Sequence, residues 1–205
     1  MKKYLVITGG AGFVGSNLIE YLVLNTNYNI ISIDNYSSGN KNNHVKTKKV
    51  KYFHGETKDV NKILKKYKSK IDTIFHFGEF SRIYQSFVHM DKCIESNTIG
   101  SHAIFNFCLI NKIRLIYSAT SASLGNKGYD KNLSPYAFTK SKNIEFLENL
   151  KKWFNFEYDV VFFYNVYGPR QITKGNMATV IGIFEEYYLK KNLYQLLNQD
   201  HNPDV

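Results

Sequence analysis

Three glycines at fixed spacing lie between the first apolar run of the chain and its first helical pattern. They are Gly9, Gly12 and Gly15 in the string Thr8-Gly9-Gly10-Ala11-Gly12-Phe13-Val14-Gly15-Ser16. Glycine permits a tight turn, a close approach of the backbone to a pyrophosphate, and close packing of the helix on the strand. The helix N-terminus adds amide donors and a partial positive charge. In this context the spacing indicates a dinucleotide site, whereas a glycine triplet alone is also typical of a plain strand-to-helix turn.

Asp34 closes the second apolar run, close to the spacing at which an acid bonds the adenosine ribose hydroxyls in such sites. No arginine follows nearby to take a 2′-phosphate, so the sequence favours NAD over NADP as the cofactor. Without the glycines, Asp34 would be interpreted as an ordinary turn or helix-cap aspartate.

Tyr136 and Lys140 form a second pair that could do chemistry. Four residues apart on a predicted helix, they share one face, and an ammonium near a phenol favours the ionised form of the phenol. A tyrosine in that state can act as a base near neutral pH. This spacing is common and is usually structural, so the pair gains weight only beside the glycines. Ser134-Pro135 predicts a cap and a first-turn proline for this helix.

The elements that must position these residues alternate along the chain as strand and helix. This alternation predicts an α/β fold: a doubly wound, Rossmann-type, mostly parallel sheet with helices on both faces. The predicted strands are Tyr4–Thr8, Ile30–Ile33, Val50–Phe53, Thr73–Phe77, Ile113–Ser118 and Val160–Tyr164. The predicted helices are Val14–Leu24, Val60–Tyr67, Cys93–Ile110, Tyr136–Trp153 and Met177–Leu189.

Composition bounds the class of protein. The chain has 205 residues, of which 43% are hydrophobic and 16% aromatic, so it can build a sizeable core and is not disordered for lack of apolar residues. A net charge of +10 would suit a polyanion. Nearly all the excess is lysine, however, and base readout relies on arginine, so we expect no nucleic-acid partner. The alternative, a nucleic-acid binder, would bind with a steep dependence on salt.

Motifs that the sequence lacks lead to expectations about the location of the protein and its metal content. Cys93 and Cys108 lack the CxxC spacing, which argues against a disulfide framework or a zinc site and favours a reducing, cytoplasmic location. No apolar run reaches the length of a signal-peptide core or a membrane span, so we expect no membrane partner. We interpret His76 as a strand-end histidine, because no second His, Cys or Asp shares metal-ligand spacing with it.

Together these residues resemble the extended short-chain dehydrogenase/reductases, specifically the NAD-dependent epimerase/dehydratase family that acts on nucleotide sugars. The resemblance runs to about Lys190 and is nearest to the UDP-glucose 4-epimerase branch. Besides the glycines and the Tyr136/Lys140 pair, it rests on Asp34-Asn35-Tyr36-Ser37-Ser38-Gly39-Asn40, Phe75-His76-Phe77-Gly78, Asn97 ahead of Gly100, and Asn165-Val166-Tyr167-Gly168-Pro169-Arg170.

The resemblance implies a role for each matching residue around NAD. The pyrophosphate would be held by the turn that contains Gly9, Gly12, Phe13, Val14 and Gly15. The adenosine half would be bound by Asp34 and Asn35 at the ribose, Ser38 at the phosphate, and Glu56 and Thr57 at the adenine, where the family more often has aspartate in place of Glu56. The rest of the cofactor would be lined by Phe77 and Gly78, supported at the nicotinamide by Asn97 and Tyr164, and bound at its other ribose by Lys140.

The resemblance also implies a catalytic set without a metal. Thr120 would bond the reacting sugar oxygen, Tyr136 would be the acid/base, and Lys140 would lower the pKa of that tyrosine. Asn165 would contact the sugar diphosphate. The implied reaction is epimerisation of a nucleotide-sugar substrate, at C4 of a UDP-hexose through a 4-keto intermediate.

Departures from the family pattern keep other functions open. Dehydratases place Asp-Glu directly after the catalytic Thr, where this chain has Ser121-Ala122, so dehydration is disfavoured, and a reductase or decarboxylase stays an alternative. Glu79, Leu124 and Phe162 each replace a residue that is usual at the edge of the site, which leaves the sugar specificity open.

The domain organisation is a further departure. We expect an NAD-binding domain over residues 1–190 and a short tail over 191–205 in place of the usual substrate region. A truncated, non-catalytic NAD-binding module is therefore a second hypothesis. A homodimer formed through the helices Cys93–Ile110 and Tyr136–Trp153 is also implied by the resemblance.

Overall fold

The computed structural model describes residues 3–124, 129, 131–175 and 178–189. It divides into two compact units, Met1–Tyr164 and Asn165–Val205. The first unit holds the whole sheet, and the second holds one described helix, α7 (Val180–Leu189). The expected tail over residues 191–205 and the start of the last predicted helix at Met177 lie outside the described residues.

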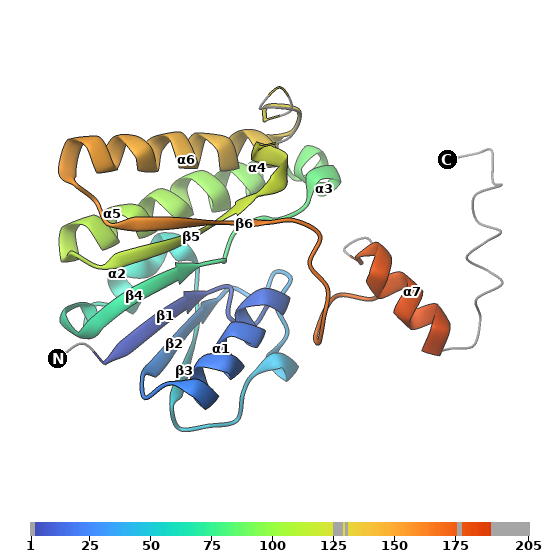
Figure 1. Ribbon diagram of the computed structural model, residues 1–205, viewed down its shortest axis with the longest axis horizontal. Helices are drawn as coiled ribbons and strands as arrows, with labels where there is room; N and C mark the ends of the chain where they lie inside the picture. The colour runs from blue at the N-terminus through green and yellow to red at the C-terminus, as the bar shows by residue number, and fades with distance from the viewer. Residues whose placement is uncertain (1–2, 125–128, 130, 176–177, 190–205) are drawn as a thin grey trace. The chain divides into compact units, whose positions relative to one another are not determined.

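The first unit is built on a six-stranded sheet in the order β3-β2-β1-β4-β5-β6, in which every neighbouring pair is parallel. Figure 1 shows β1 in the middle, between β2 and β4. The strands are β1 (Tyr4–Thr8), β2 (Asn29–Asp34), β3 (Val50–His54), β4 (Ile71–His76), β5 (Arg114–Thr120) and β6 (Tyr158–Phe163). The strand order reverses between β1 and β4, so the predicted doubly wound Rossmann-type fold is confirmed.

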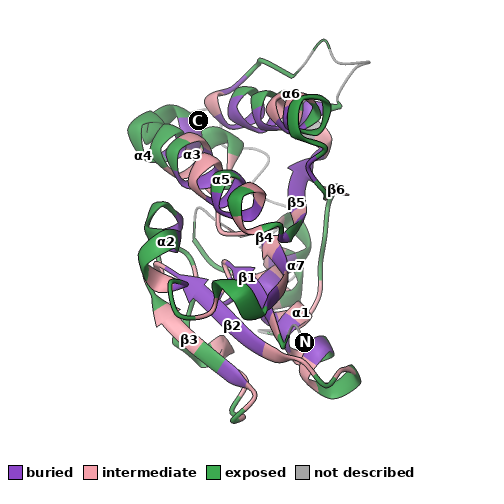
Figure 2. Cartoon of the chain, turned by 90° about the vertical axis from the view of Figure 1, so that its left-hand side faces the viewer, coloured by how far each residue is buried: buried purple, intermediate pink, exposed green. Residues whose placement is uncertain are grey.

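Helices pack on both faces of this sheet because successive side chains of a strand point to opposite faces. In β1, Leu5 and Ile7 belong to a core cluster with Ile19 of α1 (Phe13–Asn25). Val6, between them, belongs to a second cluster with Ile104 of α5 (Ser101–Asn111). Figure 2 shows the result: β1 and β2 are buried along most of their length.

The remaining helices either pack over strands β4 and β5 or lie in the connections between strands. They are α2 (Val60–Ile63), α3 (Ile83–Val88), α4 (Met90–Ile94) and α6 (Pro135–Phe154), with a π-helical segment, η4 (Glu95–Gly100), and short 3₁₀ turns η1 (Lys41–Asn43), η2 (Thr57–Asp59), η3 (Lys68–Lys70) and η5 (Ser121–Ser123). The predicted cap of α6 is confirmed: Ser134 accepts a hydrogen bond of 3.0 Å from the amide of Ala137, and Pro135 occupies the first turn. No helix in the described ranges is both long and apolar enough to cross a membrane.

The structure corrects two predicted helices and adds one that was not predicted. The helix predicted over Val60–Tyr67 ends at Ile63, where Lys62 and Lys66 would stand four residues apart and repel each other on one face. The helix predicted over Cys93–Ile110 begins at Met90 and passes through the π-helical segment η4. Helix α3 was not predicted, because its six residues give too short a pattern to show helical periodicity.

Candidate functional site

The glycine turn joins the end of β1 to helix α1 and lies against the end of β4. Gly9 has φ +70°, and a Cβ added there would lie 2.9 Å from the backbone of Gly78. A Cβ on Gly15 would lie 2.2 Å from the carbonyl oxygen of Gly9. Gly12 precedes α1 in an extended conformation and has no side chain to cap the helix, so the first amides of α1, at Phe13 and Val14, remain suited to an anion. The turn therefore fits a cofactor pyrophosphate.

Asp34, the buried last residue of β2, holds the glycine turn in place. Its Oδ2 accepts a 2.8 Å hydrogen bond from the amide of Ala11, and its Oδ1 accepts one of 2.8 Å from the amide of Tyr36. Each carboxylate oxygen has lone pairs for a further donor, so these contacts leave room for a ribose hydroxyl. The sequence indicated the ribose contact, but it carried no sign that the same carboxylate organises the turn.

The other residues expected at the adenosine half follow the carboxyl ends of β2 and β3. The Nδ2 of Asn35 donates to both carboxylate oxygens of Glu56, at 3.2 and 3.1 Å. Ser38 is exposed in the loop after β2, and Thr57 is buried, with its hydroxyl oxygen only 2.2 Å from where a Cβ on Gly100 would stand. This arrangement places polar groups around the end of β2.

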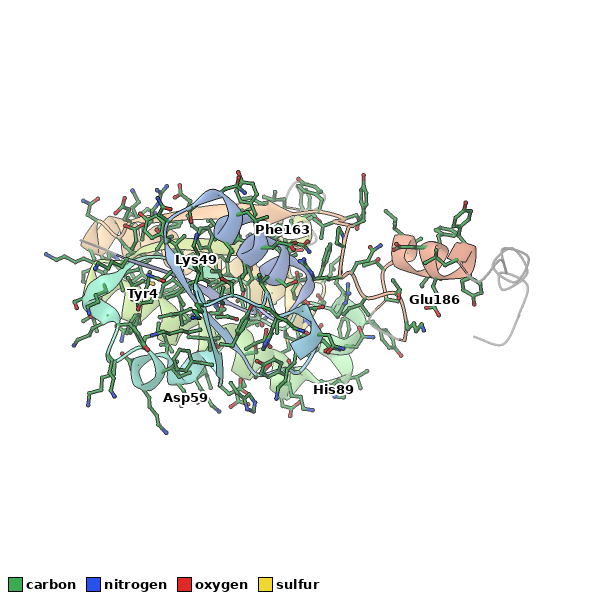
Figure 3. The ribbon with its side chains drawn as sticks, turned by 90° about the horizontal axis from the view of Figure 1, so that it is seen from below. Tyr4, Lys49, Asp59, His89, Phe163 and Glu186 are labelled. Carbon is green, nitrogen blue, oxygen red and sulfur yellow. The ribbon has the colours of Figure 1, made fainter. Side chains whose placement is uncertain are left out.

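The loop after β4 is clamped from two sides. The Thr8 hydroxyl oxygen accepts hydrogen bonds from the amides of Phe77 and Gly78, at 3.1 and 2.9 Å. Asn97, buried in η4, accepts from the amide of Phe80 at 2.7 Å and donates to its carbonyl at 3.0 Å. The Phe77 ring packs edge-on against Phe163, labelled in Figure 3, with the ring centres 5.6 Å apart. Asn97 thus holds the loop that would line the cofactor.

Thr120 and Tyr136 lie on elements that contact each other at the carboxyl edge of the sheet. Thr120 is the buried last residue of β5, and its carbonyl accepts a 2.6 Å hydrogen bond from Ser123. Tyr136 lies in the first turn of α6, with its side chain largely buried and its amide donating to the Ser86 hydroxyl at 3.3 Å. The carboxyl edge of a parallel sheet is where ligands bind in this fold.

Two further residues expected at the site lie at the end of the first unit and at the start of the second. Tyr164 follows the end of β6 and is 67% exposed. Asn165 begins the second unit. The glycine turn, Asp34, Thr120 and Tyr136 therefore belong to one unit, and Asn165 belongs to the other.

Lys140 lies one helical turn after Tyr136 and is buried in an ion pair with Glu79. Its ammonium also donates to the carbonyl oxygen of Ser118 at 2.6 Å and to the Ser118 hydroxyl at 3.2 Å. The sequence showed Glu79 only as a departure at the edge of the site. Its partner could not be found there, because the two residues are 61 positions apart and meet only when β4 and α6 are folded.

His76, at the end of β4, connects the glycine turn with this ion pair. Its Nδ1 lies 2.7 Å from the Thr8 hydroxyl oxygen, and its Nε2 lies 3.0 Å from that of Ser101. Because Thr8 already accepts from two amides, its own proton is directed to Nδ1, so we assign the imidazole proton to Nε2. Burial lowers the pKa of His76 to about 4, which keeps the ring neutral.

Comparison with known proteins decides the family. The model of the NAD dependent epimerase/dehydratase family matches residues 5–198. The chain belongs to this family. The family is NAD-dependent.

Individual relatives are epimerases of nucleotide sugars by name. A Methanocaldococcus jannaschii protein named "Putative UDP-glucose 4-epimerase" is 31% identical over 196 residues, which is 91% of this chain and 63% of that protein. The ADP-L-glycero-D-manno-heptose-6-epimerase of Brachyspira hyodysenteriae is 29% identical, over 86% of this chain and 58% of the relative. The solved UDP-glucose 4-epimerase of Thermotoga maritima, with UDP-glucose, is 26% identical, with a TM-score of 0.83, over 91% of this chain and 63% of that one. The chain thus spans about three fifths of the length of these relatives.

Proposed function

We propose that the chain forms the cofactor-binding and catalytic part of an NAD-dependent nucleotide-sugar epimerase that acts at C4 of a UDP-hexose. The observation that carries the proposal is the position of Thr120 and Tyr136 at the carboxyl edge of the sheet that also ends in the glycine turn. The names of the M. jannaschii and T. maritima relatives support the UDP-hexose and the C4 position.

The chain's own residues would bind the cofactor and manage one proton. The amides at the start of α1 would hold the pyrophosphate, and Asp34 would accept from the ribose hydroxyls. When bound, NAD supplies a nicotinamide that takes a hydride from the sugar carbon and gives it back. Tyr136 would take the proton of the C4 hydroxyl and return it after the 4-keto sugar has rotated within the site. Thr120 would form a hydrogen bond with the same oxygen.

Epimerisation is favoured over dehydration by the residues directly after Thr120. Elimination of water needs an additional acid and base near the sugar, and η5 places Ser121 and Ala122 after the threonine. Neither residue has a side chain that titrates near neutral pH. We therefore propose epimerisation and not elimination of water.

Two successive measurements test this proposal. Thermal unfolding with NAD and with NADP comes first, because a ligand that binds only the folded state raises the unfolding temperature, and NAD should raise it more. Incubation with NAD and separate UDP-hexoses, followed by chromatographic separation of the C4 epimers, comes second, with Tyr136→Phe as the control. Interconversion that the control lacks would support the proposal. Binding of NAD without interconversion of any UDP-hexose would contradict it and leave the hypothesis of a non-catalytic NAD-binding module.

We also propose that the protein is a homodimer, as its resemblance to the family implies. Exposed apolar side chains gather on α3, α4, η4 and the start of α6: Ile83, Tyr84, Phe87, Val88, Met90, Ile94, Ile99 and Phe138. Apolar surface of this kind favours contact with another protein surface.

A further inference from the structure

A positively charged side chain, Arg82, lies close to the proposed catalytic tyrosine, and no step of the proposed reaction uses it. We propose that Arg82 is a substrate-binding residue that pairs with a carboxylate on the sugar, so that the preferred substrate is a UDP-hexuronic acid, in which C6 is a carboxylate. The inference rests on the proposed function and narrows its substrate from UDP-hexoses in general to acidic ones.

The fold brings Arg82 to the carboxyl edge of the sheet. Arg82 directly precedes α3, in the connection that follows the end of β4. Strand β4 lies between β1, which leads into the glycine turn, and β5, which ends at Thr120. Ligands bind at this edge in doubly wound sheets. Arg82 therefore leaves the sheet between the strand that leads to the proposed cofactor site and the strand that carries the proposed contact to the sugar.

A hydrogen bond fixes α3 to the first turn of α6, which lies beside it in Figure 1. The amide of Tyr136 donates to the Ser86 hydroxyl at 3.3 Å. Ser86 is four residues after Arg82, and its own amide donates to the Arg82 carbonyl at 3.2 Å. Residues at this spacing lie on one side of a helix, so Arg82 and Ser86 are both on the side of α3 that meets Tyr136.

Burial and charge describe the surroundings of the Arg82 guanidinium. The side chain is only partly exposed, and its Nε atom is buried. Burial lowers the pKa of Arg82, whereas the nearby Tyr136 side chain acts to raise it, and a guanidinium remains charged at neutral pH. Glu79, the acid nearest to Arg82 in the sequence, directs its carboxylate to Lys140 and Ser101 instead. Arg82 therefore adds a positive charge next to the phenol that would meet the sugar.

A guanidinium in this position can distinguish an acidic sugar from a neutral one. The proposed reaction occurs at C4, and C6 is attached to C5, the next carbon of the ring. In a hexuronic acid the C6 carboxylate can accept two parallel N–H donors from one guanidinium, whereas a neutral hexose offers only a hydroxyl there. The diphosphate is attached at C1, across the ring from C4, so the C6 substituent is the acidic group nearer to Tyr136.

Thermal unfolding with two ligands tests this pairing. With NAD present, a concentration series of UDP-glucuronate or of UDP-glucose gives a dissociation constant for each, because a ligand of the folded state raises the unfolding temperature. The wild-type chain should bind UDP-glucuronate about tenfold or more tightly, the size expected for a hydrogen bond to a charged group. Arg82→Gln should abolish this preference and keep the affinity for UDP-glucose within about threefold. Arg82→Lys retains a charge without the planar fork and should keep part of the preference.

Arg114→Gln is the matched control. Arg114 is a half-exposed arginine that pairs with Asp159 and begins β5, at the opposite end of the strand from Thr120. This variant should keep the wild-type preference. Equal affinities of the wild-type chain for the two ligands, or a preference that survives Arg82→Gln, would overturn the inference. The wild-type comparison needs no variant, so it decides even if Arg82→Gln fails to fold.

Turnover separates this inference from the proposed function. Each UDP-sugar is incubated with NAD and the wild-type chain, and the C4 epimers are separated by chromatography. A kcat/KM for UDP-glucose equal to or above that for UDP-glucuronate would overturn the inference and support the proposed function. A tenfold binding preference for UDP-glucuronate without turnover of either sugar would support the inference and contradict the proposed function. Binding of neither UDP-sugar would overturn the inference, and the comparison of NAD with NADP would then show whether the proposed cofactor site is also wrong.

Discussion

At the scale of single residues, Asp34 both holds the glycine turn and is proposed to bind the ribose. A substitution there should first lower the affinity for the cofactor. Asp34→Ala removes the acceptor for the amides of Ala11 and Tyr36 together with the proposed ribose contact. We expect the affinity for NAD to fall by about 10- to 100-fold, since hydrogen bonds to a charged group contribute about 1.5–3 kcal/mol. Isothermal titration with NAD measures this. Asp91→Ala, at an exposed position of α4, is the control, and an equal loss of affinity in both variants would refute the assignment.

His76 gives the protein a pH-dependent stability. Burial lowers its pKa from about 6.5 in the unfolded chain to about 4, although the charge of Glu79 acts to raise it. Below pH 6.5 the unfolded state therefore binds a proton that the folded state does not. The contribution is complete above pH 6.5 and is lost as the pH falls towards 4, by about 3 kcal/mol in total.

Urea unfolding at pH 7 and at pH 4.5 measures this contribution. His76→Asn cannot titrate in this range, so its free energy of unfolding should change less between the two pH values than that of the wild type. His89→Gln, at an exposed position, should keep the wild-type pH dependence. If His76→Asn showed the wild-type dependence as well, the buried neutral imidazole would not be its source.

For these residues, features that depend on short sequence spacings could be predicted, whereas contacts between residues far apart in the sequence could not. The close packing at Gly9 and Gly15 could be predicted from the sequence because it follows from short spacings along one βαβ unit. The ribose contact of Asp34 rests on the same kind of spacing and stays a prediction. The partner of Glu79 depends on β4, β5, α5 and α6 meeting, and no spacing in the sequence encodes that meeting. The same limit hid the second duty of Asp34, because its bond to Ala11 crosses from one strand end to another.

At the scale of elements, the role of the π-helical segment η4 can be tested through Asn97. The widened turn places the Asn97 side chain against the backbone of Phe80, where it makes one accepting and one donating contact, and it also donates to Thr139 at 3.2 Å. Asn97→Ala removes these contacts, so the Phe80 carbonyl loses the Asn97 donor, while the Phe80 amide keeps a bond to the Ser96 hydroxyl at 3.2 Å. We expect a loss of about 1–3 kcal/mol in the free energy of unfolding. Urea titration measures it, with Asn106→Ala at an exposed position of α5 as the control. Equal stabilities of the two variants would argue against the clamp.

Periodicity predicted the long elements well and the irregular ones poorly. All six strands were found, and β1 has the predicted bounds. The residues of β1 from Leu5 to Thr8 are buried, and a strand buried on both faces gives a continuous apolar run. Periodicity extended the helix predicted from Cys93 straight through residues 95–100, since one π-helical turn changes the register by a single residue. It missed α3, whose Tyr84 and Phe87 are exposed and so form no buried face.

At the scale of the whole molecule, the fold and the family could be predicted because ordered motifs span most of the chain. The family match over residues 5–198 agrees with that resemblance. The specificity for one sugar could not be predicted, since Asn165 belongs to the second unit and the chain spans about three fifths of the length of its relatives. The residues that we propose for the cofactor site, by contrast, all belong to the first unit, so NAD binding is a property that this chain can be tested for directly.

The proposed homodimer gives a prediction for the assembled molecule. Ile99, in η4, and Phe138, in α6, are 56% and 44% exposed and belong to the two helical regions expected to meet a second copy. Ile99→Glu would bury a carboxylate without a partner in that interface, and such a charge costs several kcal/mol, so the dimer dissociation constant should rise by about 100-fold or more. Sedimentation velocity over a range of concentrations measures it. Tyr21→Glu changes an exposed apolar residue of α1, on the opposite face of the sheet, and should leave the dimer intact. A wild-type chain that sediments as a monomer at all concentrations would contradict the dimer. A dimer that tolerates Ile99→Glu would show that the interface lies elsewhere.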